Sequence, residues 1–195
     1  MKTSRNELLG DLTQMTHSII QRAEQFKVLD EKGLQFKASP GAWNILECLE
    51  HLNLYGDFYL VEIEKQILKS DQSPAATIFR SGWLGNYFAK MMLPKADGSI
   101  SKIKTFDDKD PSKSQLPLTT IDRFLKQQDR ILELLELAKN VDLSRVKTGI
   151  TISNWIRLRL GDTFRVVIYH NERHMQQAER VWKQLSAKRE AVKAD

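Results

Sequence analysis

Apolar residues recur at every third or fourth position through four long segments of the chain, which places them along one face of a helix in each segment. No segment alternates convincingly between apolar and polar residues, as a half-buried strand would. Cap residues support the boundaries, because Ser39 and Pro40 precede the second segment and Thr119 opens the third. The sequence therefore predicts an all-α fold, a four-helix bundle. Its helices are expected at residues 4–31, 43–69, 119–140 and about 153–187.

The stretch between the second and third predicted helices, residues 70–118, differs in composition from the helices. It carries all but one of the prolines of the chain: Pro74, Pro94, Pro111 and Pro117. Its one strong apolar patch, residues 83–93, predicts a short helix within a long crossover. A connection of this kind is expected if the second and third helices run parallel, or if the segment forms a lid over a site. The apolar patch would also suit the interface of a homodimer.

Length and composition favour a single soluble domain that spans residues 1–195. Hydrophobic residues make up 41% and charged residues 28% of the chain, so neither a disordered nor a membrane protein is indicated. No apolar run approaches the roughly 20 residues of a spanning helix, and the first residues do not resemble a secretion signal. The one cysteine, Cys48, is predicted to be a buried core residue. We therefore expect a cytoplasmic protein.

The excess of positive charge does not indicate a nucleic-acid-binding protein. The formal net charge is +5, but the lysines and arginines are scattered over the whole chain and form no basic stripe. We therefore expect neither nucleic acid nor a membrane among the partners. The expected ligand is a small molecule.

Three histidines lie on predicted helices in positions that would bring them together. His170 and His174 are four residues apart, so their imidazoles project from the same side of one helix, one turn apart. His51 lies at the edge of the apolar face of the second helix. Two interpretations fit this spacing: a metal site with open coordination positions, or ordinary core histidines that are hydrogen-bonded to their neighbours.

Two stretches around these histidines resemble the signatures of the DinB-like superfamily. Residues 40–52 read PGAWNILECLEHL, a tryptophan followed by an acidic residue and a histidine. Residues 170–177 read HNERHMQQ, a histidine pair with an arginine and a following glutamine. The order and spacing of the helices extend the resemblance over nearly the whole chain. The family includes the bacillithiol transferases and relatives of the mycothiol-dependent maleylpyruvate isomerase. The resemblance implies a four-helix bundle with a histidine triad that holds a divalent cation.

The resemblance implies that His51, His170 and His174 are metal ligands, with water in the remaining positions. Neutral imidazoles suit Zn, Ni or Fe, and the sequence does not choose among them. Because these ligands carry no charge, the ion keeps its full positive charge, which favours a bound thiolate or hydroxide.

Two side chains near the predicted ligands are candidates for a catalytic role. Glu47 lies one turn before His51, where it could hold the free N–H of that imidazole or act as a base. An exposed acid at the edge of the bundle is the alternative interpretation of Glu47. Gln177 lies three residues beyond His174 and could orient a ligand or water.

Two functions follow from the predicted metal site. The first is a thiol transferase or hydrolase that acts on a small electrophilic molecule through a metal-activated thiolate or water, with a low-molecular-weight thiol as the co-substrate that the resemblance suggests. The second is a metal- or small-ligand-binding protein of a stress response without turnover. The chain has no Ser/His/Asp arrangement, phosphate-binding glycine loop or dinucleotide motif, so the enzyme hypothesis rests on the metal site alone.

Overall fold

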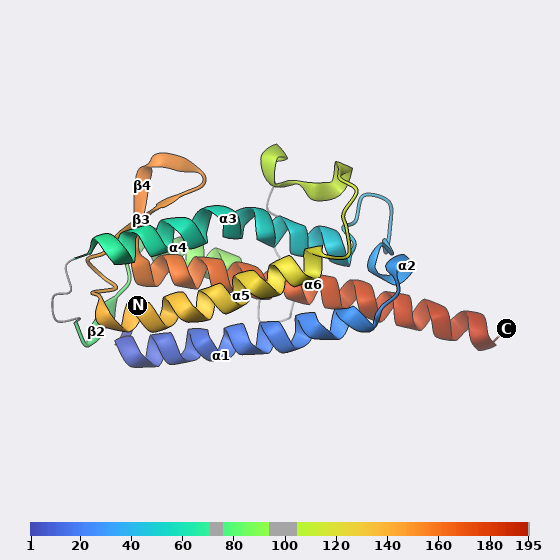
Figure 1. Ribbon diagram of the computed structural model, residues 1–195, viewed down its shortest axis with the longest axis horizontal. Coiled ribbons are helices and arrows are strands. Elements are labelled where there is room, and N and C mark those ends of the chain that lie inside the picture. Colours follow the sequence, from blue (N-terminus) through green and yellow to red (C-terminus); the bar gives the residue numbers. More distant parts are fainter. Residues whose placement is uncertain (71–75, 94–104, 195) are drawn as a thin grey trace.

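Four long helices run side by side in the computed structural model, which describes residues 1–70, 76–93 and 105–194 (Figure 1). The predicted helical fold is confirmed. Each long helix contributes its apolar face to one hydrophobic core, for example through Leu12, Leu49, Phe124 and Phe164. No helix in these three ranges is long and apolar enough to cross a membrane. The helices are α1 (Arg5–Glu24), α3 (Ile45–Lys69), α5 (Thr120–Leu137) and α6 (Leu160–Ala194).

Short elements extend two of the long helices. α1 ends before the predicted limit and gives way to a 3-10 turn, η1 (Gln25–Val28), which is followed by the single-turn helix α2 (Glu31–Leu34). α5 ends in another 3-10 turn, η4 (Ala138–Asn140), close to the predicted end of the third helix.

The order of the helices in space explains the long connection in the middle of the chain. α1 and α3 each pack against both α5 and α6. Asn53 on α3 donates to the carbonyl of Thr120 at the start of α5, and Glu64, farther along α3, pairs with Arg130, farther along α5. α3 and α5 therefore run parallel, so the chain between them must return along the length of the bundle. This agrees with the expectation that the long crossover connects two parallel helices.

The crossover contains the predicted short helix, α4 (Trp83–Met92), which packs against α6. Strand β2 (Ile78–Arg80) precedes α4 and pairs antiparallel with β1 (Lys2–Ser4). Two 3-10 turns, η2 (Asp107–Lys109) and η3 (Pro111–Lys113), follow and contact α3. Residues 71–75 and 94–104 of the predicted crossover, with Pro74 and Pro94, lie outside the described residues.

The fourth long helix begins later than the sequence predicts, at Leu160 and not near residue 153. β3 (Lys147–Ile150) and β4 (Ser153–Arg159) precede it as an antiparallel hairpin. Ile156 lies four residues before Leu160 and so fits the apolar face of a helix. It also lies two residues before the buried Leu158, which is the spacing of apolar residues along a strand. β3 supplies the backbone hydrogen bonds that favour the strand, and these long-range partners are invisible in the local pattern. Among the described residues, two small two-stranded sheets thus accompany the helices, whereas the sequence predicted no strand.

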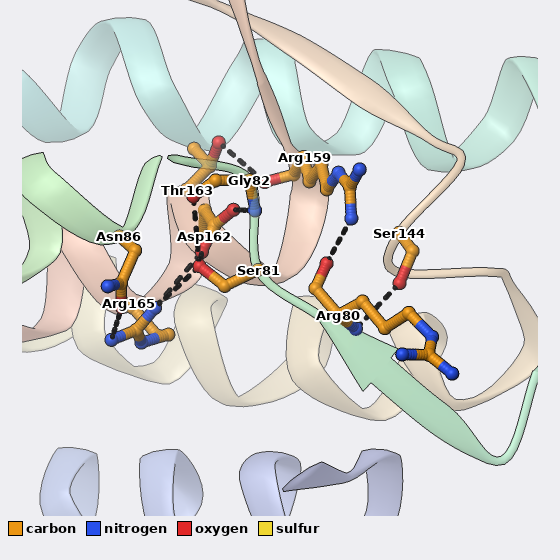
Figure 2. Close-up of polar contacts among 9 residues, drawn as sticks. All are labelled: Arg80, Ser81, Gly82, Asn86, Ser144, Arg159, Asp162, Thr163 and Arg165. Atoms are coloured by element: carbon orange, nitrogen blue, oxygen red, sulfur yellow. Dashed lines mark hydrogen bonds and ion pairs between the residues drawn. The ribbon is translucent and has the colours of Figure 1, made fainter. Parts of the chain in front are cut away.

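A buried ion pair holds α4 against the first turn of α6 (Figure 2). Oδ2 of Asp162 accepts a hydrogen bond of 2.7 Å from the N–H of Gly82, the residue that precedes α4, and the hydroxyl of Ser81 also donates to this carboxylate. Arg165 pairs with Asp162 at 3.0 Å and donates to Oδ1 of Asn86 on α4 at 3.1 Å. The carboxylate of Asp162 therefore caps the N-terminal end of α4, where a negative charge is favourable.

Replacing Asp162 by alanine should lower the free energy of unfolding by about 3–5 kcal/mol, because the Arg165 guanidinium and the Gly82 N–H would stay buried without their partner. Urea denaturation followed by circular dichroism measures this change. The matched control is Glu136→Ala, which removes an exposed ion pair with Lys139 and should change the free energy by less than about 0.5 kcal/mol. A loss of under about 1 kcal/mol for Asp162→Ala would contradict this account.

Candidate metal centre

The three histidines singled out in the sequence lie together between α3 and α6. Their ligand atoms are all within 4.8 Å of one another, and Nε2 of His51 is 3.3 Å from Nε2 of His170. His51 and His174 are buried, with 3% and 8% of their surfaces exposed, and His170 is half-buried. The cluster forms because the two histidines of α6 share one face, which packs against the face of α3 that carries His51. These three nitrogens lie close enough to hold one metal ion.

Hydrogen bonds fix the tautomer of two of the three rings. Nδ1 of His51 lies 2.7 Å from the backbone carbonyl oxygen of Lys109, which can only accept, so Nδ1 must carry the proton. Nδ1 of His174 donates in the same way to Oε1 of Gln177 at 3.0 Å. In both rings the lone pair then belongs to Nε2. A cation held by the Nε2 atoms would satisfy these lone pairs, and such a second hydrogen bond on Nδ1 is typical of metal-ligating histidines.

Burial keeps the three imidazoles neutral at physiological pH. Loss of solvation lowers the pKa of His51 to about 4. It lowers the pKa of His170 and His174 well below the ordinary value, and the nearby imidazoles, which would repel a second positive charge, lower both further. Neutral imidazole is the form that binds metal ions, so no proton has to be displaced at pH 7.

Aromatic rings enclose the triad on two sides. The ring centroid of Trp43, in the loop before α3, lies 4.7 Å from that of His51 and 5.7 Å from that of His174. Tyr55, one turn after His51, lies 5.0 Å from His51 and 4.9 Å from His170. Sequence reasoning missed Tyr55, although its spacing of four residues from His51 on one helix face was a usable signal. Such contacts limit the rotation of the imidazoles.

Glu47 does not hold the N–H of His51, because the carbonyl of Lys109 takes that position. Its carboxylate accepts from the backbone N–H of Asn44 at 2.8 Å and pairs with Lys37 at 2.7 Å. Asn44 in turn accepts from the backbone N–H of Glu47, so the two residues form a capping box at the start of α3. Glu47 is also buried and not exposed at the edge of the bundle. Both of its carboxylate oxygens therefore serve the fold.

The triad opens onto a cavity of about 930 Å³ between α3, α4, α5, α6 and the β3–β4 hairpin. Beyond the histidines, its wall is largely apolar. This volume can enclose a small organic molecule. Cys48 is not part of the wall: it is fully buried, and burial raises the pKa of its thiol. Apolar residues from several elements line the cavity, among them Tyr59, Phe88, Ile131, Ile150, Leu158 and Val167.

The stability of the metal-free protein should fall as the pH is lowered from about 6.5 towards 4. The unfolded chain takes up protons on its histidines near pH 6.5, whereas the pKa of His51 in the folded state is about 4. Each such histidine should reduce the free energy of unfolding by about 1.4 kcal/mol per pH unit in this window. Chemical denaturation of chelator-treated protein at a series of pH values measures the slope.

The slope should decrease when His51 is replaced by glutamine and should be unchanged in His17→Gln, since His17 is exposed on α1. An equal slope in wild type and His51→Gln would contradict the burial of a neutral imidazole at this position.

Comparison with known proteins identifies a family that the chain matches. The family described as the DinB superfamily matches residues 11–178, a range that includes all three histidines and the helices that carry them. No curated protein and no solved structure matches the chain. The match covers most of the sequence and agrees with the helical fold and with the two motifs around the histidines. The chain belongs to the DinB superfamily.

Proposed function

We propose that the protein is a metal-dependent enzyme that transfers a thiol to a small electrophilic molecule or hydrolyses such a molecule. The proposed ligands of a divalent cation are His51, His170 and His174. The observation that carries the proposal is the convergence of three neutral imidazoles at the wall of a cavity that can take a small molecule. Three protein ligands leave positions for substrate, which is typical of catalytic and not of structural metal sites.

The donor set and its surroundings fit such an ion. Neutral nitrogen ligands suit Zn, Ni or Fe. The Lys109 carbonyl and the Gln177 side chain hold the rings of His51 and His174 through Nδ1, so that Nε2 is the ligand atom in each. When bound, a divalent cation supplies Lewis-acid chemistry, which makes a thiol or a water molecule nucleophilic at neutral pH.

The lining of the cavity favours thiol transfer over hydrolysis. Attack by water is commonly assisted by a carboxylate base, and none of the described residues that line the cavity is Asp or Glu. A thiol that has lost its proton to solvent needs no base: its sulfur bonds to the electrophilic carbon as the leaving group departs with its electron pair. The thiol must come from a second molecule, because Cys48 is fully buried outside the cavity.

Tyr55 is proposed to stabilise negative charge on the substrate. It lines the cavity next to His51 and His170. Burial raises the pKa of its hydroxyl to about 12, so the group keeps its proton at neutral pH. A protonated hydroxyl can donate a hydrogen bond to the oxygen or leaving group on which charge develops.

A metal- or small-ligand-binding protein without turnover is the second candidate. The lack of a carboxylate base in the described lining favours it, since binding alone needs no base. The two candidates share the metal site and differ only in whether a bound molecule is converted.

Purified, untagged protein should contain close to one divalent cation per chain, as measured by elemental analysis. His51→Ala, His170→Ala and His174→Ala should each lower the metal affinity by at least about tenfold, because each removes one of three ligands. His17→Ala is the matched control, since it removes an exposed histidine and should leave the metal content unchanged. Circular dichroism verifies the fold of each variant. Absence of metal from wild-type protein after loading with Zn, Ni or Fe would reject the proposal.

Metal-loaded protein should accelerate transfer of a low-molecular-weight thiol to 1-chloro-2,4-dinitrobenzene, followed by absorbance over a panel of thiols. His170→Ala should abolish the acceleration, and Tyr55→Phe should lower kcat by about tenfold with the metal retained, because it removes a single hydrogen-bond donor. Phe58→Leu is a control on an exposed position of α3 and should keep full activity. Stoichiometric metal with no turnover of any thiol or ester substrate would favour the binding protein over the enzyme.

A further inference from the structure

One side of α4 is exposed although it carries two aromatic rings. Trp83 is 85% and Tyr87 is 56% exposed, and the exposed Lys90 continues this side, because residues four and seven positions apart lie on one side of a helix. The other sides of α4 serve the fold and the site, since Ala89 is buried and Phe88 lines the cavity. Neither packing in the core nor the cavity explains the exposed rings.

β4 presents a side of the same kind. Trp155 is 94% exposed, and Arg157 follows it at the spacing of two that keeps side chains on one side of a strand. Leu158, on the opposite side, is buried and lines the cavity. The hairpin of β3 and β4 stands out from the bundle (Figure 1), and Ile152, which follows β3, is also exposed. Exposed apolar residues that gather in this way are typical of an interaction surface.

Contacts at the foot of the hairpin hold β4 next to the start of α4. The two elements pack against each other. The guanidinium of Arg159 donates to the backbone carbonyl of Arg80 in β2, and the N–H of Arg80 donates to Oγ of Ser144 at 3.0 Å (Figure 2). The exposed sides of α4 and β4 are therefore neighbours, and we name them the aromatic–basic surface. It consists of Trp83, Tyr87, Lys90, Ile152, Trp155 and Arg157.

The chain around this surface carries charge of one sign. Residues 76–93 and 144–161 contain both exposed sides and include no Asp or Glu. Scattered along the whole chain, the basic residues give no reason to expect a membrane partner, but the fold brings those of these two ranges together. They are Arg80, Lys90, Arg145, Lys147, Arg157 and Arg159.

The carboxylates that flank the two ranges have partners of their own. Asp142 accepts from the backbone N–H of Ser144, and Glu62 of α3 accepts from that of Gly149, each at 2.8 Å. The carboxylate of Asp162 is buried in its ion pair with Arg165. These carboxylates are fewer than the basic residues, so this part of the molecule keeps a net positive charge.

We infer that the aromatic–basic surface binds an anionic lipid bilayer, with the rings of Trp83, Tyr87 and Trp155 in the interfacial layer and Lys90 and Arg157 against the headgroups. Tryptophan and tyrosine favour this layer because one end of each side chain is apolar and the other is polar. Anionic lipids attract lysine and arginine at the same depth. The inference is independent of the proposed metal site.

The same observations favour lipid over two other partners. A second copy of the chain would bring the basic residues of two identical surfaces together, and neither surface has an acid within residues 76–93 or 144–161 to offset them. Single-stranded nucleic acid binds along a groove whose rings stack on bases. Here the hairpin projects, and the aliphatic Ile152 beside Trp155 offers a base no ring on which to stack.

Sedimentation of the full-length protein with vesicles tests the inference. Vesicles of phosphatidylcholine with about one third phosphatidylserine should bind the protein at least about tenfold more tightly than vesicles of phosphatidylcholine alone, at about 0.05 M salt. Raising the salt to about 0.5 M should weaken this binding, because it screens the attraction between exposed charges. Lipids brominated near the headgroup should quench the fluorescence of the wild-type protein, since Trp83 and Trp155 would lie in the interfacial layer.

Substitutions on the surface should weaken binding to the anionic vesicles without unfolding the protein, because the side chains are exposed. Trp155→Ala should reduce the affinity by about tenfold, whereas Trp155→Phe should keep most of it. Arg157→Gln and Lys90→Gln should each reduce it by up to about fivefold.

Two control variants change exposed residues away from the aromatic–basic surface. Val28→Ala removes an apolar side chain that is 77% exposed in η1, at the end of α1 that lies away from the β1–β2 sheet. Lys126→Gln on α5 matches Lys90→Gln in its change of charge. Both controls should bind the anionic vesicles as the wild type does. Circular dichroism verifies the fold of every variant.

Equal affinities for the neutral and the anionic vesicles, or unchanged binding of both Trp155→Ala and Arg157→Gln, would overturn the inference. A dimer in analytical ultracentrifugation that Trp155→Ala dissociates, without binding to vesicles, would assign the surface to a second copy and overturn it as well. Salt-sensitive binding of a single-stranded oligonucleotide in place of vesicles would have the same consequence. None of these results affects the proposed metal site, which elemental analysis tests separately.

Discussion

Three imidazoles that lie side by side, two of them buried and one half-buried, constrain the residues that surround them. Withdrawn from water, each ring is more stable in its neutral form, and each N–H still requires an acceptor. For two of the rings the acceptor is a backbone carbonyl or a glutamine amide, and Trp43 and Tyr55 pack against the imidazoles. The packing of the three imidazoles between α3 and α6 thus determines their orientation, their protonation state and their limited rotation.

The path of the chain makes this burial possible. Because α3 and α5 run parallel, their connection has to travel back along the bundle, and its described parts pack against α6 through α4 and against α3 through η2 and η3. The same connection supplies the carbonyl of Lys109 to His51 and the side chains of Phe88 and Met91 to the cavity wall. Asp162 then ties the start of α4 to α6 (Figure 2), so the helix that closes the cavity is attached to the helix that carries two of the histidines. Fold and site share these contacts.

Much of the fold could be predicted from the sequence because the long helices are amphipathic and the spacing of four between His170 and His174 has a direct meaning on a helix. The β3–β4 hairpin could not be predicted, since Ile156 fits both the helical and the strand periodicity. Only the pairing of β4 with β3 decides between the two. The contacts of Glu47 were predictable in principle, because an asparagine followed three residues later by a glutamate is a capping pattern. The contact between His51 and the Lys109 carbonyl was not predictable, because a main-chain carbonyl leaves no pattern in the amino-acid sequence.

The use of a main-chain oxygen to hold His51 has an evolutionary consequence. Every amino acid has the same main-chain carbonyl, so a substitution at position 109 leaves the hydrogen bond to His51 available. With respect to this hydrogen bond, sequence changes at position 109 are therefore neutral. An insertion or deletion within η2 (Asp107–Lys109) would instead displace the oxygen and release the imidazole. We therefore expect selection within the lineage of this protein to act on the length of η2 more strongly than on the identity of the residue that makes the contact.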